Sequence, residues 1–339
     1  MTQALHGGDV SEFGRRFEVD EESVLDFSSN LNWFLPEMED EAWLELKESA
    51  GAYGEASGRG VSRQIAEVFG YASSQIMATA GSIEAIYLTA QLLRGRRILI
   101  GRPGFADYAR AFAGAEVRYW DLSIDDESLN WAEVVIFGSP NNPTGVRYRV
   151  DEYQARWPGK TWLVDETFVE FSREKPTAPL EDLILFRSLT KSWRIPGLRV
   201  GFLLTSNQEW IKQLAGLQPP WSVSAVAQAW AQASLHHESQ QKVEAAIQAQ
   251  LSERDAMMAR LGKMEGFKLH PTDANFFLIE LPHGGALNLW EQLGEKGIMV
   301  RSGEGFAGLI ADRFLRIAVR QRADNERLEA ALREAVASL

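Results

Sequence analysis

The sequence predicts an α/β protein with a large, mostly parallel sheet and a smaller α+β domain after it. From about residue 60, short apolar runs alternate with stretches in which apolar residues recur at helical spacing. This alternation is typical of a parallel sheet that is covered by helices on both faces. Pro219-Pro220 interrupts the pattern, and a long helical stretch and a second, shorter series of elements follow it.

The elements of the predicted large sheet lie between residues 60 and 204. Val61 to Gly70 predicts a helix, and Gly81-Ser82 begins another that continues to about Leu93. A third helix is predicted at 106–113. Short apolar runs predict strands at 97–100, 117–122, 133–137, 161–164, 183–186 and 200–204.

The C-terminal part predicts a smaller α+β domain. Ser222 to about Leu261 predicts one long packed helix, because Val226, Trp230 and Ala233 fall on the apolar spacing of a helix. Strands are predicted at 275–281, 298–301 and 314–319, with helices at 287–296 and from 324 onward.

The composition excludes several classes of protein. The 339 residues are enough for one large domain and a smaller one, and 45% hydrophobic residues are too many for a disordered chain. The absence of cysteine excludes disulfides, thiolate metal ligands and a cysteine nucleophile. A net charge of −12 argues against a protein that coats nucleic acid, although it allows a local basic pocket. The polar N-terminus and the short apolar runs, well under the ~18 residues of a membrane span, lead us to expect a cytoplasmic protein.

A lysine-containing segment after the strand at 183–186 is the first candidate for chemistry. Lys191 has a hydroxyl three residues before it, Ser188, and an arginine eight residues after it, Arg199. A partly desolvated lysine beside cations loses proton affinity and becomes a nucleophilic amine, which can form a Schiff base with an aldehyde cofactor. Ser188 and Arg199 could together hold a phosphate. Taken alone, the segment is equally compatible with a surface lysine in a polar loop.

Three further segments follow predicted strands or begin a helix. Asp165 directly follows a buried strand, where a carboxylate can keep a pyridine nitrogen protonated, or can simply cap a helix. Ser139 to Gly145 is a turn rich in proline, and its Asn142 could donate to a phenolic oxygen. Gly81-Ser82 begins a helix, and helix N-termini favour phosphate.

Together, these four segments predict a site for pyridoxal 5′-phosphate (PLP). The chain also resembles a known family over essentially its whole length. It is similar to the fold-type I PLP enzymes of the class I and II aminotransferase family, in the histidinol-phosphate aminotransferase branch. Within that branch it looks most like the L-threonine-O-3-phosphate decarboxylases of cobalamin biosynthesis. The motifs that carry the resemblance are His6-Gly7-Gly8, Asp26 to Asn30, Pro103 to Tyr108, Arg187 to Arg199, Pro220 to Val223 and Arg316 to Arg320.

The resemblance implies the aspartate aminotransferase-like fold and a role for each matching residue. It implies a mostly parallel seven-stranded sheet, an N-terminal arm (1–35) that packs with the small domain, a large PLP-binding domain (36–235) and a small domain (236–339). Lys191 would form the Schiff base and Asp165 would pair with the pyridine nitrogen. The other cofactor-binding residues would be Gly81, Ser82, Ile83, Phe105, Asn142, Ser188 and Arg199, with Tyr53 from the neighbouring subunit of a homodimer.

The substrate side of the site is also implied by the resemblance. Arg316 would bind the substrate carboxylate, and His6 and Arg301 would bind a substrate phosphate, with Asn30 and Asn142 lining the same pocket. The pocket would thus be cationic inside an acidic protein. No metal site is expected, because the adjacent His236 and His237 would not share a helix face.

Three positions depart from the usual patterns. Many aminotransferases have a tyrosine three residues after the aspartate, whereas this chain and the decarboxylase pattern have phenylalanine there, Phe168. Ile83 replaces a hydroxyl residue of the phosphate loop and can offer only its backbone N–H. Trp33 stands where proline usually follows the N-terminal Asn-x-Asn motif.

The leading hypothesis is therefore decarboxylation of L-threonine O-3-phosphate to 1-amino-2-propanol O-2-phosphate. The alternative is transamination of histidinol phosphate or another amino acid. The two reactions differ in which bond at Cα stands perpendicular to the cofactor ring, and the sequence does not fix that angle. A third hypothesis, a PLP-fold binding or regulatory module, is disfavoured because Lys191, Asp165, Asn142 and Arg199 are all present.

Overall fold

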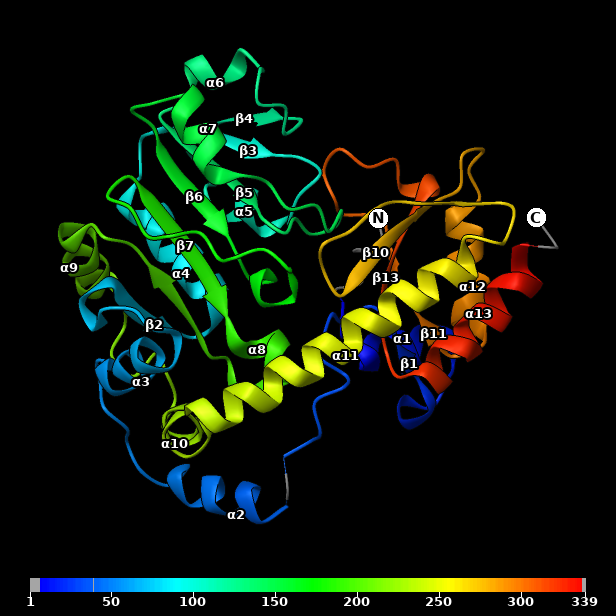
Figure 1. Ribbon diagram of the computed structural model, residues 1–339, viewed down its shortest axis with the longest axis horizontal. Coiled ribbons are helices and arrows are strands. Elements are labelled where there is room, and N and C mark those ends of the chain that lie inside the picture. The colour runs from blue at the N-terminus through cyan, green and yellow to red at the C-terminus, as the bar shows by residue number, and fades with distance from the viewer. Residues whose placement is uncertain (1–6, 39, 337–339) are drawn as a thin grey trace.

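The protein has two lobes connected along one long helix. The computed structural model describes residues 7–38 and 40–336. Figure 1 shows a lobe built around a large sheet and a smaller lobe, with α11 (His237–Leu261) running from one to the other. Both lobes contribute to the candidate site, so their arrangement decides which side chains meet.

The larger lobe contains a seven-stranded sheet in the order β2-β8-β7-β6-β5-β3-β4. β8 is antiparallel to β2 and β7, and the other neighbouring strands are parallel. This confirms the predicted α/β fold with a mostly parallel sheet. The strands are β2 (Ile76–Thr79), β3 (Arg97–Gly101), β4 (Glu116–Trp120), β5 (Val134–Gly138), β6 (Thr161–Asp165), β7 (Leu183–Ser188) and β8 (Gly201–Leu204).

Helices cover both faces of this sheet, which explains why its strands are apolar at consecutive positions. Ile98 and Ile100 of β3 pack in one apolar cluster, whereas Leu99 between them packs in the cluster on the opposite face. Burying each such side chain stabilises the fold by about 1.5–3 kcal/mol. The helices of this lobe are α2 (Asp40–Ser49), α3 (Arg59–Phe69), α4 (Gly81–Leu92), α5 (Asp107–Ala111), α6 (Ser128–Trp131), α7 (Val150–Arg156), α8 (Leu189–Ser192), α9 (Gln208–Leu217) and α10 (Ala225–Ser234).

The smaller lobe contains a four-stranded antiparallel sheet in the order β12-β13-β10-β9. Its apolar side packs against α11, α12 and α13 in a core that is separate from the two clusters of the large sheet. The elements are β9 (Lys268–Leu269), β10 (Phe276–Glu280), α12 (Ala286–Glu295), β12 (Arg301–Ser302), β13 (Phe314–Ala318) and α13 (Arg322–Val336).

The N-terminal residues pack against the smaller lobe. β1 (Leu25–Asp26) pairs in parallel with β11 (Ile298–Met299), and the Ala318 N–H donates to the Phe27 carbonyl at 2.9 Å. α1 (Val10–Phe17) contacts α12 through Phe17, whose ring centroid lies 5.1 Å from that of Trp290. The segment that contains Ser28 and Asn30 is thereby held beside β13.

Two elements predicted as continuous are divided in the structure. The single helix predicted from Ser222 to Leu261 is wrong, because α10 ends at Ser234 and α11 begins at His237. His236 starts the second helix as its N-cap, with a ring nitrogen accepting from the Ser239 N–H at 3.3 Å. The predicted strand 298–301 is also two strands, since β11 pairs with β1 while β12 pairs with β13.

Two kinds of feature, a membrane-spanning helix and a metal site, are absent from the part of the chain that the structure describes. Within residues 7–38 and 40–336, no helix has both the length and the apolar character to cross a bilayer. In the same residues, no group of three or more histidine, aspartate or glutamate side chains is placed to hold a metal ion.

The packing of α1 against α12 predicts a steric effect at Gly294. A Cβ at Gly294 would lie 2.3 Å from Cζ of Phe17, so Gly294→Ala must displace the ring. We expect the variant to lose about 1–3 kcal/mol of the free energy of unfolding, as measured by urea denaturation. Gly216→Ala is the matched control, because a Cβ in that part of α9 meets nothing within 4 Å. The control should be neutral or more stable by about 0.5–1 kcal/mol. Equal effects of the two substitutions would contradict the contact between α1 and α12.

Candidate active site

A cavity of about 290 Å³ lies where the two lobes meet, at the carboxyl ends of the central strands. Parallel sheets commonly place binding residues at this edge. The predicted cofactor residues that line it are Ser82, Ile83, Phe105, Asn142, Asp165, Ser188, Lys191 and Arg199. The predicted substrate residues that line it are Asn30, Asn142, Arg301 and Arg316.

Lys191 lies in α8, immediately after β7. The Ser188 hydroxyl caps this short helix by accepting from the Thr190 N–H at 3.3 Å, and the Asn32 N–H donates to the Lys191 carbonyl at 2.9 Å. The Lys191 amine has no hydrogen bond or ion pair with any residue that the structure describes. Burial lowers its pKa to about 8, and the Arg316 and Arg199 cations act in the same direction while Asp26 opposes them. The amine is therefore largely available as a nucleophile under mildly alkaline conditions.

Asp165 ends β6 and has donors on both carboxylate oxygens. The Tyr108 hydroxyl donates to Oδ2 at 2.8 Å, and the Thr167 N–H donates to Oδ1 at 2.9 Å. Burial raises the pKa of Asp165, while its hydrogen bonds with Thr167 and Tyr108 act in the opposite direction. These donors fix the orientation of the carboxylate, which lines the cavity and can face a protonated ring nitrogen.

The start of α4 forms a cradle that a side chain would fill. Gly81 has φ +77°, and a Cβ there would lie 2.7 Å from Nη2 of Arg199. A Cβ at Gly201 of β8 would lie 2.5 Å from the Ser82 nitrogen. The two glycines thus allow the Arg199 guanidinium and a neighbouring strand to approach the helix N-terminus. Backbone N–H groups, the helix dipole and Arg199 together suit a phosphate.

Asn142 and Phe105 occupy loops on the other side of the cavity. The Arg316 guanidinium donates through Nη1 to Oδ1 of Asn142. The Asn142 amide nitrogen then remains to donate to a ligand, as the sequence predicts. Phe105 packs edge to face on Tyr108, with ring centroids 5.6 Å apart, and it presents an apolar wall to the cavity.

The substrate side is dominated by two neighbouring arginines. Arg301 of β12 and Arg316 of β13 are register partners in antiparallel strands. Arg316 is buried and donates to the Ser28 carbonyl, while its Nε has no partner among the described residues. Burial lowers the pKa of Arg316 to about 9, helped by the Arg301 charge and opposed by Asp26. Neither arginine has a carboxylate partner among the described residues, which leaves positive charge for an anionic ligand.

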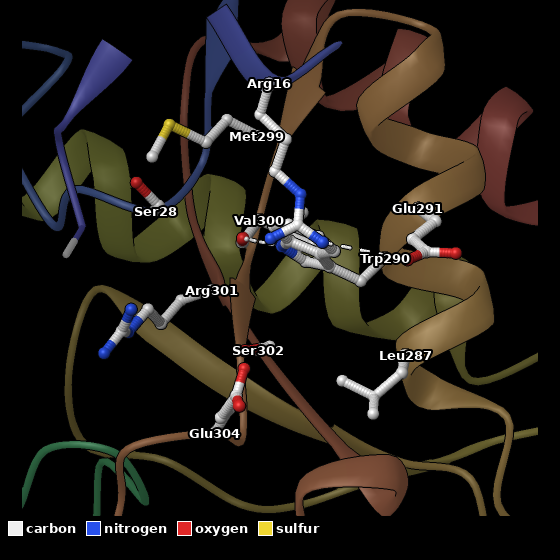
Figure 2. Close-up of a pocket in the computed structure, with 10 residues that line it drawn as sticks. All are labelled: Arg16, Ser28, Leu287, Trp290, Glu291, Met299, Val300, Arg301, Ser302 and Glu304. Atoms are coloured by element: carbon white, nitrogen blue, oxygen red, sulfur yellow. Dashed lines mark hydrogen bonds and ion pairs between the residues drawn. The ribbon is translucent and has the colours of Figure 1, made fainter. Parts of the chain in front are cut away.

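A smaller cavity of about 120 Å³ adjoins the first and shares Ser28 and Arg301 with it. Figure 2 shows Arg16 lying over the indole of Trp290, with the Arg301 head group directed away from both. The Arg16 guanidinium carbon is 4.5 Å from the Trp290 ring centroid, and its Nη2 is 3.8 Å from a Glu291 oxygen. Arg16 is therefore already held by an ion pair, whereas Arg301 has a cation–π contact with Phe306, at 5.3 Å from the ring centroid, and no ion pair among the described residues.

Two predicted residues do not line the main cavity, and the position of a third is not described. Gly81 lies behind it, against Arg199. Tyr53 is 86% exposed and stacks on Trp221 with ring centroids 4.9 Å apart, outside this chain's own cavity. His6 lies outside the described residues.

Sequence reasoning missed several residues that line the cavity. Tyr108 belongs to the motif Pro103 to Tyr108. Its position three residues after Phe105, about one helical turn, is the signal that could have assigned it to the site. Thr190 lies beside Lys191 in the motif Arg187 to Arg199, which is a similar signal. Thr167 and Phe306 lacked such a signal, because only the fold brings their loops to the cavity.

The arrangement fits PLP. The cradle at Gly81 suits the phosphate of that cofactor, and the unpartnered amine of Lys191 suits its aldehyde. The oriented carboxylate of Asp165 suits the ring nitrogen, and the donor of Asn142 suits the phenolic oxygen. Asp107 and Asp165 are the acidic residues among the described residues that line the cavity.

Comparisons with known proteins agree with this geometry. Residues 24–333 match the family model described as aminotransferase class I and II. The chain is 30% identical to threonine-phosphate decarboxylase from Salmonella typhimurium, over 100% of this chain and 98% of that protein. It is 29% identical to histidinol-phosphate aminotransferase from Prosthecochloris aestuarii, over 71% and 72% of the two chains.

Solved structures show the same fold. The crystal structure of L-threonine-O-3-phosphate decarboxylase from Porphyromonas gingivalis superposes with a TM-score of 0.81 at 26% identity, covering 91% of this chain and 98% of the other. The predicted aspartate aminotransferase-like fold is confirmed. The chain belongs to the class I and II aminotransferase family, and it is a PLP-dependent enzyme.

Proposed function

We propose that this enzyme decarboxylates L-threonine O-3-phosphate to 1-amino-2-propanol O-2-phosphate, a reaction of cobalamin biosynthesis. The observation that carries the proposal is the pair of arginines without acidic partners, Arg301 and Arg316, opposite Lys191. The proposed substrate has a carboxylate and a phosphate on either side of its amine, so it can meet both guanidinium groups. The similarity along the full length to a threonine-phosphate decarboxylase supports the same substrate.

Each residue of the site has a proposed part in this reaction. When bound, PLP supplies an electron sink for the bond that breaks at Cα. Asp165 keeps the ring nitrogen protonated, and Ser82, Ser188 and Arg199 hold the cofactor phosphate. Arg316 binds the substrate carboxylate and holds the Cα–carboxylate bond perpendicular to the ring, the orientation in which CO₂ leaves.

The remaining groups bind the phosphate and replace the lost carboxylate by a proton. Arg301, together with His6, binds the substrate phosphate, and Asn30 lines the same pocket. CO₂ leaves without the electrons of the broken carbon–carbon bond, which the bound cofactor would accept, so one proton must then be added at Cα. Lys191 lines the cavity and has its pKa lowered to about 8, so it would be suited to give up that proton near neutral pH.

Transamination of histidinol phosphate or another amino acid is the second candidate. The match to a histidinol-phosphate aminotransferase over 71% of the chain favours it. Against it stands Phe168, which is buried against Phe276 with ring centroids 4.9 Å apart. It offers no hydroxyl where many aminotransferases have a tyrosine.

We further propose a cytoplasmic homodimer in which Tyr53 reaches the cofactor phosphate of the neighbouring subunit. Trp221, which contacts Tyr53, is exposed, and so are Trp43 and Leu44 of α2. A surface of this kind is typical of an interface. In each subunit, residues 1–35 would act as an arm of the small domain (236–339) that closes over substrate held by the large domain (36–235).

The first prediction is the reaction itself. The purified protein with PLP should release one CO₂ per 1-amino-2-propanol O-2-phosphate formed from L-threonine O-3-phosphate, as measured by gas release and by mass spectrometry. Arg301→Gln should raise KM about 10- to 100-fold, because one charge-assisted contact to the phosphate is lost. Arg118→Gln, on the exposed edge strand β4, is the matched control and should leave KM unchanged. A keto acid product without CO₂ would overturn the proposed reaction in favour of transamination.

The second prediction concerns the pH dependence of Lys191. Its amine attacks an aldehyde only when it is unprotonated, and its pKa is lowered to about 8. The rate at which the cofactor-free protein gains the absorbance of bound PLP should therefore rise with pH and level off above about 8. Lys191→Ala should show no such absorbance, whereas Lys212→Ala on α9 should behave like the wild type. A rate that keeps rising to the ordinary lysine pKa of 10.5 would contradict the desolvated amine.

The third prediction concerns the subunit interface. Sedimentation equilibrium should give twice the 37.9 kDa chain mass. Tyr53→Phe should weaken PLP binding about tenfold through loss of one hydrogen bond to phosphate, whereas the exposed Tyr119→Phe on β4 should not. A monomer at micromolar concentration, or equal PLP affinity of the two variants, would rule out the crossing of Tyr53.

A further inference from the structure

Asp26 is a buried carboxylate beside residues that line the cavity. It is 8% exposed, and no ion pair joins its side chain to a residue that the structure describes. A buried charge of this kind costs several kcal/mol unless hydrogen bonds satisfy it. Four donors do so here, namely the backbone N–H and the hydroxyl of Ser28 and of Ser29. Both serines line the main cavity, whereas Asp26 does not.

One peptide group connects Asp26 with Arg316. The Ser29 N–H donates to Oδ1 of Asp26 at 3.1 Å, and the Ser28 carbonyl accepts from Nη2 of Arg316. This N–H and this carbonyl belong to the same planar, trans peptide group, so they point in opposite directions. A carboxylate that fixes the direction of the N–H therefore also fixes the direction of the carbonyl toward the guanidinium. Each end of the peptide has a charged partner, which strengthens both hydrogen bonds.

The backbone of Asp26 is itself held in place, so the carboxylate is a fixed point. Asp26 pairs with Met299 in the β1–β11 ladder, and its carbonyl accepts from Nη1 of Arg320 at 3.1 Å. The negative charge also acts on Arg316, because Asp26 opposes the lowering of the Arg316 pKa by burial and by Arg301. Asp26 therefore affects both the direction and the charge of the guanidinium.

The same turn holds the start of the described chain. The Ser28 hydroxyl donates to Oδ1 of Asp26 at 2.6 Å, so its lone pairs accept from the Gly8 N–H at 2.8 Å. Gly7 lines the cavity, and a Cβ there would lie 2.7 Å from the Ser28 carbonyl oxygen and 3.5 Å from Nη2 of Arg316. The residues before α1 thus lie on the peptide group that joins Asp26 to Arg316.

We propose that Asp26 is a positioning residue for Arg316, acting through the turn that it forms with Ser28 and Ser29. Held in this way, the guanidinium keeps one Nη group on the Ser28 carbonyl, while its unpartnered Nε is left for the carboxylate of the substrate. The effect of Asp26 on a ligand passes through this peptide and Arg316. The inference rests on the role proposed above for Arg316.

The test measures binding of 4-phosphonobutyrate to the PLP-loaded full-length protein by isothermal titration calorimetry. This probe has a carboxylate and a phosphonate at the spacing of the proposed substrate but no amine, so its binding does not depend on turnover. Asp26→Ala removes the acceptor and should weaken the probe about tenfold. Asp26→Asn keeps Oδ1 for the backbone donors, and it should bind within about threefold of the wild type, or more tightly because a negative charge is lost.

Two measurements separate positioning from a general loss of structure. The affinity for PLP should change less than about threefold in either variant, since the cofactor residues are on other elements. Asp20→Ala is the matched control, because Asp20 accepts from the Glu22 N–H at 3.2 Å in an exposed turn of the same kind. It should leave both affinities unchanged. If Asp26→Ala does not fold, Asp26→Ser provides the test, because a serine hydroxyl replaces an aspartate in such turns only weakly. It should bind the probe about threefold more weakly than Asp26→Asn.

A double-mutant cycle tests whether Asp26 acts through Arg316. In an Arg316→Gln background, Asp26→Ala should weaken the probe by less than about twofold. Additive effects would overturn the inference and leave the proposed function intact, and so would wild-type affinity of Asp26→Ala or Asp26→Ser. A tenfold loss in Asp26→Asn would overturn positioning in favour of charge alone. No binding of the probe to the wild type would instead overturn the proposed role of Arg316, and the inference with it.

Discussion

The buried guanidinium of Arg316 is the contact at which three parts of the chain meet. It is carried by β13, and it donates to the Ser28 carbonyl of the N-terminal segment and to Asn142 of the large lobe. Burying a cation costs several kcal/mol unless its donors are satisfied, and neutral carbonyl oxygens satisfy only part of that need. Nε has no partner among the described residues, and Arg301 adds a second positive charge beside it. The protein alone is therefore less stable here than it would be with an anion bound, a common relation between stability and function.

The same excess of positive charge acts on Lys191. Arg316 and Arg199 disfavour its protonated form, in addition to the larger effect of burial. The groups that hold anionic ligands thus also produce a nucleophilic amine. A protein with a net charge of −12 can thus present a cationic cavity, because the described residues that line it include four cations, Lys191, Arg199, Arg301 and Arg316, against Asp107 and Asp165.

The parts of the fold that the sequence predicts best are the strands buried on both faces. Runs such as 134–137 and 162–164 are apolar at every position, so their type is clear without knowledge of their neighbours. β2 is not predicted, because Ile76–Thr79 is a run of only four residues between a polar loop and the start of a helix. The break at His236 was missed because a histidine N-cap is uncommon and the apolar spacing continues on both sides of it. β11 and β12 are separated at Val300 because they pair with different strands, and no local sequence pattern encodes the choice of partner.

For the site, most of the residues that the motifs assigned line the cavity. Thr167 could not be assigned, because its relation to Ser82 exists only once the loop after β6 and the start of α4 are brought together. Trp33, which stands in place of the usual proline, also has a structural explanation. The Arg194 and Arg320 guanidinium groups lie 4.9 and 3.8 Å from its ring centroid.

The pairing of β1 with β11 determines the order in which the two halves of the active site can form during synthesis of the chain. Leu25 and Asp26 are made first, but their partners Ile298 and Met299 leave the ribosome near the end of translation. The large sheet, with Ser82, Asp165 and Lys191, is complete in sequence well before that point. Because contacts between distant segments form only after both have been made, the half of the site that holds the cofactor precedes the half that holds the substrate. A nascent chain can therefore contain every residue that binds PLP while the arginines that select the substrate do not yet exist.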